Sequence, residues 1–154
     1  LAWQAEGREL SQMTPDTGSA SVTLSLHDEP CATREYLLSR LGASDLAIWD
    51  ARSAAEYSGD KVLAAKGGHI PGARNFEWTL GMDPAHALRI RPDMADILHN
   101  LGITPDKELI THCQTHHRSG FTYLVAKALG YPRVKAYAGS WGEWGNHPDT
   151  PVER

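Results

Sequence analysis

The sequence predicts a single α/β domain with a mainly parallel sheet, and three observations support this fold class. The chain has 154 residues, a length that suits one compact domain. Hydrophobic residues make up 41% of it, which is enough for a buried core and excludes wholesale disorder. Short apolar runs alternate with amphipathic stretches, the pattern of βαβ units. We therefore expect parallel strands covered by helices on both faces.

Uninterrupted apolar runs mark the central strands of this sheet. Leu46–Asp50 (LAIWD) and Glu108–His112 (ELITH) are typical of parallel strands buried on both faces. The remaining strands are expected over residues 21–26, 73–76 and 134–137. The helices, where apolar residues recur at helical spacing, are expected over 32–41, around Glu56 up to Gly59, once or twice within 84–101, and over 121–129.

Composition and charge exclude several classes of function. The net charge of −4 argues against general binding to nucleic acid or anionic membranes. No apolar run approaches the roughly 18–20 residues that a membrane span needs. Cys31 and Cys113 are too far apart for a C-x-x-C metal site or a disulfide framework. A lone reactive thiol favours a reducing compartment, so we expect a cytoplasmic protein without a secretory signal.

The segment around Cys113 carries the most chemical information. The sequence His112-Cys-Gln-Thr-His-His-Arg-Ser-Gly120 joins an expected strand to an expected helix, at the sheet edge where open α/β folds bind ligands. Free N–H groups and the helix dipole there favour an anion, either a bound oxyanion or the Cys113 thiolate. His116, His117 and Arg118 add cations or donors. A thiolate stabilised in this way is a nucleophile at neutral pH.

Three other interpretations of this segment are open. Cys113 could be a small buried hydrophobe, but the basic and imidazole residues beside it argue otherwise. His112, Cys113, His116 and His117 are metal-ligand types, yet zinc sites draw ligands from two separated clusters and no second cluster is present. No metal is therefore expected. A Cys–His protease would need a base and an orienting group that the sequence does not locate.

Three segments together resemble the rhodanese family of sulfurtransferases. The loop at 112–120 is similar to the family's active-site loop. Gly68-His-Ile-Pro-Gly-Ala73, which follows Asp50-Ala-Arg52, resembles its first signature, and Tyr137-Ala-Gly-Ser-Trp-Gly-Glu-Trp144 resembles its C-terminal signature. The resemblance implies a rhodanese-like fold with a mainly parallel sheet of about five strands and helices on both faces.

The resemblance is nearest to the catalytic C-terminal half of tandem-domain bacterial thiosulfate sulfurtransferases. It implies that residues 1–20 are the tail of a preceding rhodanese-like repeat, with Leu1–Gly7 as its end and the polar stretch 8–20 as the interdomain linker. Residues 21–154 are then the catalytic domain. The missing N-terminal repeat is an expected partner, and apolar surface that it would cover is expected to promote association of the isolated chain.

The family's reaction is a two-step sulfur transfer. The Cys113 thiolate would take the sulfane sulfur of thiosulfate as a persulfide, release sulfite, and pass the sulfur to cyanide or to a thiol or dithiol acceptor. This covalent intermediate needs no external cofactor and implies ping-pong kinetics.

Three relatives of this function remain as alternatives. A 3-mercaptopyruvate sulfurtransferase carries small residues after the cysteine, whereas Gln114 to His117 are bulky and polar. A Cys-dependent phosphatase has five residues between cysteine and arginine, whereas four separate Cys113 from Arg118. A non-catalytic binding module of this family typically lacks the cysteine, which is present here.

The resemblance also implies roles for individual residues. Cys113 is the nucleophile, and the main-chain N–H groups that would cradle the outer sulfur belong to Gln114, Thr115, His116, His117, Arg118 and Ser119. Arg118 and His117 would attract the sulfonate of the donor, unless Arg118 folds back to hold the loop. The supporting residues, expected to fix loops and pack around the site, are Asp50, Arg52, His69 and Trp141.

Overall fold

The computed structural model describes residues 2–25, 27 and 29–154. The strands of this part of the chain are β1 Leu46–Asp50, β2 Arg74–Asn75, β3 Met82–Asp83, β4 Arg89–Ile90, β5 Glu108–His112 and β6 Val134–Ala136. The α-helices are α1 Ala2–Ala5, α2 Arg34–Arg40, α3 Ala54–Ser58, α4 Met94–Asn100, α5 His117–Ala128 and α6 Ser140–Trp144. Two short 3₁₀ helices are η1 Trp78–Gly81 and η2 Pro84–His86.

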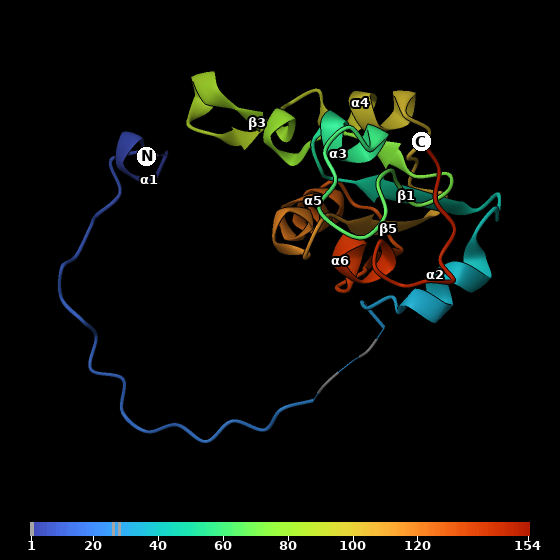
Figure 1. The fold of residues 1–154 in the computed structure, drawn as a ribbon. Coiled ribbons are helices and arrows are strands. Elements are labelled where there is room, and N and C mark those ends of the chain that lie inside the picture. Colours follow the sequence, from blue (N-terminus) through green and yellow to red (C-terminus); the bar gives the residue numbers. More distant parts are fainter. Residues whose placement is uncertain (1, 26, 28) are drawn as a thin grey trace.

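Four strands form a parallel sheet in the order β2-β1-β5-β6, as Figure 1 shows. β1 and β5 pair along their whole length, so their last residues, Asp50 and His112, lie opposite each other at one edge. Beyond β6, Cys31 forms a single parallel bridge with Ala136, which extends the sheet by one residue. The expected α/β class and parallel sheet are confirmed, and about five strands is roughly consistent with four strands and this bridge.

The strand expected over 21–26 is wrong for the residues that the structure describes there. Residues 21–25 form no strand, and Leu26 lies outside the described residues. The apolar side chains of this segment, Val22 and Leu24, are 71% and 78% exposed. An alternating β pattern stabilises a strand only through the packing of its side chains, and these two side chains have no core to pack against.

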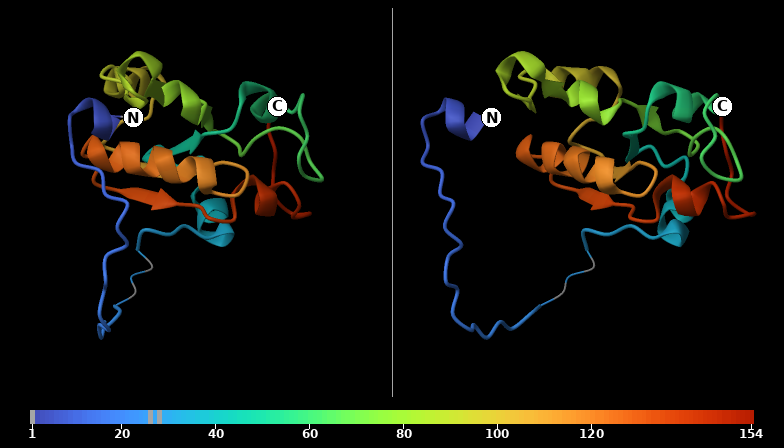
Figure 2. Two further views of the ribbon diagram at one scale, coloured as in Figure 1. Left: turned by 90° about the vertical axis from the view of Figure 1, so that its left-hand side faces the viewer. Right: turned by 60° about the vertical axis from the view of Figure 1, so that its left-hand side comes forward.

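Two cores cover the two faces of the sheet, because successive strand residues point to opposite sides. Trp49 of β1 and Leu109 of β5 enter one core, with α4 and α5. Ile48 and Ile110, which lie opposite each other on the two strands, enter the other core. Leu37 of α2 and the tryptophans of α6 pack there as well. Figure 2 shows α5 (orange) on one side of the strands and α2 (cyan) and α6 (red) on the other. The expected helical layers on both faces are confirmed.

Two short segments differ from their predicted positions. The stretch 84–101, expected to hold one or two helices, contains η2, the two-residue strand β4 and α4, and β4 pairs with β3 as a small antiparallel hairpin. α5 begins at His117, four residues before the helix expected at 121. Its first turn (His-Arg-Ser-Gly) has no apolar residue, so hydrophobic periodicity could not reveal it.

The N-terminal residues 2–25 add no strand to the sheet and no side chain to its two cores. Residues 8–25 contain no helix or strand and run as a long loop between α1 and α2 (Figure 1). Leu1, the first residue of the expected repeat end, lies outside the described residues. No helix in the described part of the chain is both long and apolar enough to cross a membrane.

Candidate active site

The loop 113–116 lies at the carboxyl edge of the sheet, where β5 ends and α5 begins. β5 is buried along all five residues, so Cys113 leaves the sheet from a rigid support. His116 takes the position before the first helical residue with a left-handed backbone, φ +67°. This turn is tight enough to direct the N–H groups of the first turn of α5 back toward Cys113.

The C-terminal segment clamps the main chain on either side of the cysteine. The N–H groups of Trp141 and Gly142 donate to the carbonyls of Cys113 and Gln114, at 2.9 and 2.8 Å. The N–H of Cys113 donates to the hydroxyl of Ser140 at 3.3 Å. Ser140 has φ +51°, a backbone conformation that costs free energy for a residue with a side chain. The last signature segment therefore positions Cys113.

The Cys113 side chain is fully buried among hydrogen-bond donors. Burial alone would raise the pKa of the thiol. Hydrogen bonds to the sulfur from the Ser119 hydroxyl, and from the N–H groups of Ser119, Thr115 and Arg118, outweigh this effect and lower the pKa of Cys113. The loop thus gathers donors around one sulfur and favours its anionic form.

Arg118 forms a bidentate ion pair with Glu56 of α3, with N–O distances of 2.8 and 2.9 Å. The guanidinium of Arg118 is the largest cause that lowers the pKa of Glu56, to about 2, and Ser53 adds hydrogen bonds. Glu56 in turn raises the pKa of Arg118, to which the nearby sulfur of Cys113 also contributes. In this structure the ion pair ties the first turn of α5 to α3.

A buried ion pair lies beneath the loop, at the end of β1. Arg52 holds the carboxylate of Asp50 through contacts of 2.6 to 3.0 Å and donates to the carbonyl of Gly68 at 2.8 Å. Its guanidinium lies 4.4 Å from the ring centre of Trp141, a cation–π contact that links the pair to α6. Asp50, Arg52 and Trp141 thus form one buried cluster behind the cysteine.

His112 joins this cluster from β5. Its Nε2 lies 3.5 Å from the Asp50 carboxylate and has no hydrogen-bond partner within the described residues. Desolvation lowers the pKa of His112, and the neighbouring Asp50 opposes this only partly. The ring lies 3.3 Å from the carbonyl of Cys113 through Nδ1. A neutral imidazole therefore lies against the main chain of Cys113.

The other predicted residues take different places. His116 and Ser119 contact each other, with Nδ1 2.8 Å from the hydroxyl oxygen. Thr115 and His117 are exposed at the mouth of the loop, and Gln114 donates to the carbonyl of Leu63 at 3.1 Å. His69 is buried next to Gly68, whose carbonyl accepts from Arg52. Its ring stacks on Tyr57, and its main chain forms an antiparallel β-bridge with Glu153.

Two residues that hold the loop were not among the predicted site residues. Glu56 was expected only as part of a short helix, although Ser53-x-x-Glu56 is a capping-box pattern that marks a fixed glutamate at a helix start. Ser140 lies within a signature segment, but no local pattern predicts its left-handed backbone or the hydrogen bond that its hydroxyl accepts from Cys113. Among the described residues, no group of three or more His, Cys, Asp and Glu side chains is arranged to hold a metal ion.

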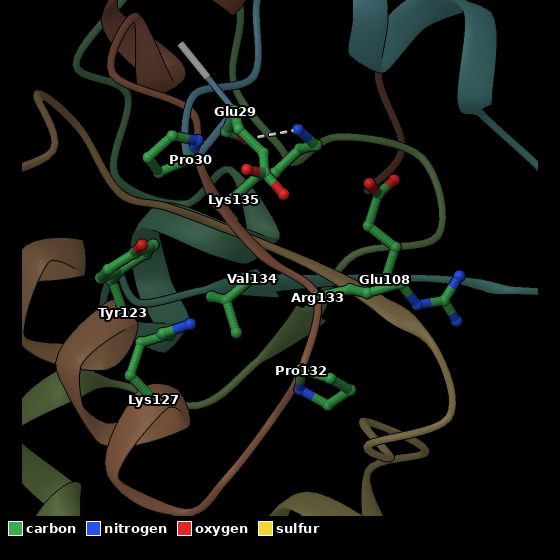
Figure 3. Close-up of a pocket in the computed structure, with 9 residues that line it drawn as sticks. All are labelled: Glu29, Pro30, Glu108, Tyr123, Lys127, Pro132, Arg133, Val134 and Lys135. Atoms are coloured by element: carbon green, nitrogen blue, oxygen red, sulfur yellow. Dashed lines mark hydrogen bonds between the residues drawn. The ribbon is translucent and has the colours of Figure 1, made fainter. Parts of the chain in front are cut away.

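A separate cavity of about 400 Å³ lies beside the edge strand β6 and is lined by residues outside the loop (Figure 3). Three of its charged groups already have partners. Tyr36 donates to both oxygens of Glu108, Lys135 donates to the carbonyl of Glu29, and Arg133 donates to the carbonyl of Asp106. This cavity offers room but few free donors, in contrast to the loop at Cys113.

The family model described as "Rhodanese-like domain" matches residues 33–147, which include β1, the loop and α6. The chain belongs to the rhodanese-like domain family. It is 75% identical over 152 residues to a thiosulfate sulfurtransferase of Azotobacter vinelandii and 73% identical to one of Pseudomonas aeruginosa. Each alignment covers 99% of this chain but 56% of the relative. The chain therefore spans about half the length of these curated relatives.

Solved structures of other proteins share the fold. The chain aligns with an anaerobic ergothioneine biosynthesis enzyme from Chlorobium limicola with a TM-score of 0.81 and 27% identity, over 98% of this chain and 39% of that one. It also aligns with an EanB variant in which ergothioneine is covalently linked with a cysteine persulfide, with a TM-score of 0.82 and 28% identity, over 98% of this chain and 38% of that one.

Proposed function

We propose that this rhodanese domain is a thiosulfate:cyanide sulfurtransferase with Cys113 as the nucleophile. The single observation that carries this proposal is the position of Cys113, which is fully buried where β5 ends and the N–H groups of α5 begin. Main-chain and Ser119 hydrogen bonds that lower the pKa of its thiol support it. Such a cradle suits a thiolate and, after sulfur transfer, the terminal sulfur of a persulfide. The names of the 75% and 73% identical relatives support thiosulfate as the donor.

The proposed reaction has two displacements. The Cys113 thiolate attacks the sulfane sulfur of thiosulfate, a Cys113–sulfur bond forms, and the sulfur–sulfur bond of thiosulfate breaks with its electron pair leaving on sulfite. Cyanide, or a thiol or dithiol acceptor, then attacks the outer sulfur of the persulfide and releases the Cys113 thiolate. The sulfur is carried covalently, so the cycle needs no external cofactor.

The residues of the loop and its support would have different roles in this reaction. We assign the cradle of the outer sulfur to the main chain of residues 114–119, of which Thr115, Arg118 and Ser119 already donate toward the sulfur. The positive charge of Arg118, next to the sulfur and anchored by Glu56, would stabilise negative charge on the departing sulfite. His117, exposed at the mouth, would attract the donor. Asp50, Arg52 and Trp141 would support the loop from below.

The chain is also proposed to be the catalytic half of a longer protein. Its relatives contain about as much sequence again, and residues 8–25 form no helix or strand, as expected of an interdomain linker. Residues 1–20 would then be the tail of a preceding rhodanese-like repeat plus that linker, and the repeat would be a partner of the domain at 21–154. A reactive thiol such as Cys113 suits the reducing cytoplasm.

Steady-state kinetics test this function. Thiocyanate production from thiosulfate and cyanide should give parallel double-reciprocal lines, because sulfite leaves before cyanide binds. 3-Mercaptopyruvate and a phosphate monoester, offered at the same concentrations, should be turned over far more slowly. Intersecting lines, or faster turnover of either alternative substrate, would contradict the proposal.

A further inference from the structure

Gly142 is the third residue of α6, and its backbone does not require a glycine. Its φ is not positive, so alanine could adopt the same conformation. A glycine inside a helix also lowers stability relative to alanine. The reason for a glycine at this position therefore lies in what surrounds it.

The main chain of the Cys113 loop lies directly against Gly142. A Cβ atom at this position would lie 2.9 Å from the carbonyl oxygen of Gln114, whereas the next nearest atoms, in the side chains of Thr115 and Gln114, would be 3.9 and 4.0 Å away. Ordinary contact begins at roughly 3.5 Å, so one of the two main chains would have to move by about half an ångström. The N–H of Gly142 donates to the same carbonyl at 2.8 Å, so this close approach also carries a hydrogen bond.

The loop is fixed on the side of the cysteine. The carbonyl of Cys113 accepts from the N–H of Trp141 at 2.9 Å, and the N–H of Cys113 donates to the hydroxyl of Ser140 at 3.3 Å. The side chain of Gln114 donates to the carbonyl of Leu63 at 3.1 Å. Any displacement of Gln114 would therefore strain the contacts that hold the main chain of Cys113.

α6 cannot retreat from the loop, because it is held from behind. Trp144 is fully buried in the core on that face of the sheet. The carbonyl of Gly145 accepts from the N–H of Lys66 at 3.0 Å, and the side-chain oxygen of Asn146 accepts from the N–H of Ala65 at 2.8 Å. An added side chain would therefore displace the loop rather than the helix.

The peptide unit that would move joins Gln114 to Thr115. In a trans peptide the C=O and the N–H point in opposite directions. Because the carbonyl of Gln114 points to α6, the N–H of Thr115 points away from α6. This N–H belongs to the main-chain cradle of the proposed reaction, so the contact with Gly142 fixes the direction of one of its donors.

We propose that Gly142 is a positioning residue for sulfur transfer. Its missing side chain allows α6 to hold the carbonyl of Gln114, and this contact keeps the main chain beside Cys113 in the geometry that the reaction needs. The role is indirect, through the main chain of Gln114. The inference rests on the proposed sulfur transfer and adds a residue outside the loop to it.

The test adds one methyl group. Gly142→Ala places it against the carbonyl of Gln114. Gly81→Ala is the matched control, because Gly81 also lies in a helical segment without a positive φ, and a Cβ there would lie 3.3 Å from the ring of Phe121, a side chain that can yield. A gain in helix propensity offsets the crowding in Gly142→Ala, so its urea midpoint should change by less than about 0.5 M.

Sulfite release in the first turnover is followed at increasing thiosulfate concentration. In Gly142→Ala the maximal rate constant should fall about tenfold, because a reacting group is misplaced, while the half-saturating thiosulfate concentration should change less than about twofold. Gly81→Ala should leave both unchanged. The protection of the amide of residue 142 against hydrogen exchange, measured without thiosulfate, should fall about tenfold in Gly142→Ala, as its bond to Gln114 lengthens.

A glycine with only a structural role predicts a different outcome. Gly142→Ala would be less stable, but its maximal rate constant per folded molecule would equal that of the parent protein, and this result would overturn the inference. A higher half-saturating concentration at an unchanged rate constant would overturn it as well.

Two further outcomes are separated by the exchange measurement. If Gly142→Ala does not fold, the parent protein decides: strong protection of its amide 142 supports the contact, and an unprotected amide contradicts it. If the parent protein releases no sulfite while the protection falls as expected in Gly142→Ala, the sulfur transfer is wrong and the contact between α6 and the loop stands.

Discussion

The Cys113 loop and the cavity beside β6 differ in whether their polar groups are available to bind a ligand. In the cavity, about 400 Å³ in volume, Glu108, Arg133 and Lys135 are bound to other protein groups (Figure 3). In the loop, N–H groups at the start of α5 converge on a single sulfur. The loop, rather than the cavity, therefore holds the preorganised donors.

On the proposed function, reactivity in this fold depends on directed main-chain dipoles rather than on available volume. A parallel sheet ends all its strands at one edge, and the helix that follows β5 presents its unpaired N–H groups there. None of the described residues that line the β6 cavity lies in the first turn of a helix. Substitutions in the two regions should therefore differ sharply in their effects, and the four predictions below run from the largest to the smallest.

Replacing Cys113 should abolish the activity that we propose for the loop. Cys113→Ser leaves a hydroxyl that stays protonated in the same cradle, so sulfur transfer from thiosulfate should fall more than about a thousandfold. Thiocyanate production measures this loss. Cys31→Ser, which changes the other free cysteine, is the matched control and should retain the parent rate. Equal losses in the two variants would mean that the loop is not the reacting site.

Breaking the buried pair beneath the loop should cost the most stability. Arg52→Ala leaves the Asp50 carboxylate buried without its partner, which should lower the free energy of unfolding by about 3–5 kcal/mol. Urea denaturation followed by tryptophan fluorescence measures the change. The double variant Asp50→Asn/Arg52→Met, which removes both charges, should recover part of this loss. A change below about 1 kcal/mol in Arg52→Ala would show that the pair is not a structural anchor.

Releasing Arg118 from Glu56 should have a smaller and pH-dependent effect. Glu56→Gln should lower the free energy of unfolding by about 1–3 kcal/mol at pH 7, since the pair is only partly shielded from solvent. The pKa of Glu56 is about 2 in the folded chain, below its ordinary value of 4.5. Its contribution is therefore complete above pH 4.5 and is lost as the pH falls toward 2. Denaturation of both proteins at pH 7 and near pH 3 should show the difference shrinking; a constant difference would contradict the pairing.

Changing the β6 cavity should do least. Lys127→Ala removes a cation from its wall without touching the loop, so the rate of thiocyanate production should change less than about twofold, in the range of surface substitutions. The same substitution made at Arg118 should slow sulfur transfer at least about tenfold, through loss of charge next to the sulfur. Similar effects of the two variants would remove the distinction between the regions.

The sequence predicted the central strands and the position of Cys113 between a strand and a helix better than the surrounding contacts. β1 and β5 have the bounds expected for them because uninterrupted apolar runs of this length have few alternatives to a buried strand. The loop at Cys113 followed from its place between a strand and a helix. Each of these signals lies within a few neighbouring residues, so one sequence is enough to detect it.

The contacts that were missed join residues far apart along the chain. Glu56 and Arg118 are 62 positions apart, and Cys113 and Ser140 are 27 apart, so neither pairing leaves a local pattern. The hairpin of β3 and β4 consists of two-residue strands, too short for an alternating pattern. The strand predicted over 21–26 is absent from residues 21–25 for the opposite reason. Its alternating pattern is typical of a strand, but its apolar side chains are exposed rather than packed on a core.

The mass of the intact protein after incubation with thiosulfate tests the central claim most directly. The protein is desalted, weighed, then treated with cyanide and weighed again, alongside Cys113→Ala. The account predicts a gain of about 32 Da, one sulfur atom carried covalently, which is absent from the variant and removed by cyanide. No gain on the parent protein, or an equal gain on Cys113→Ala, would contradict the assignment of Cys113 as the sulfur carrier.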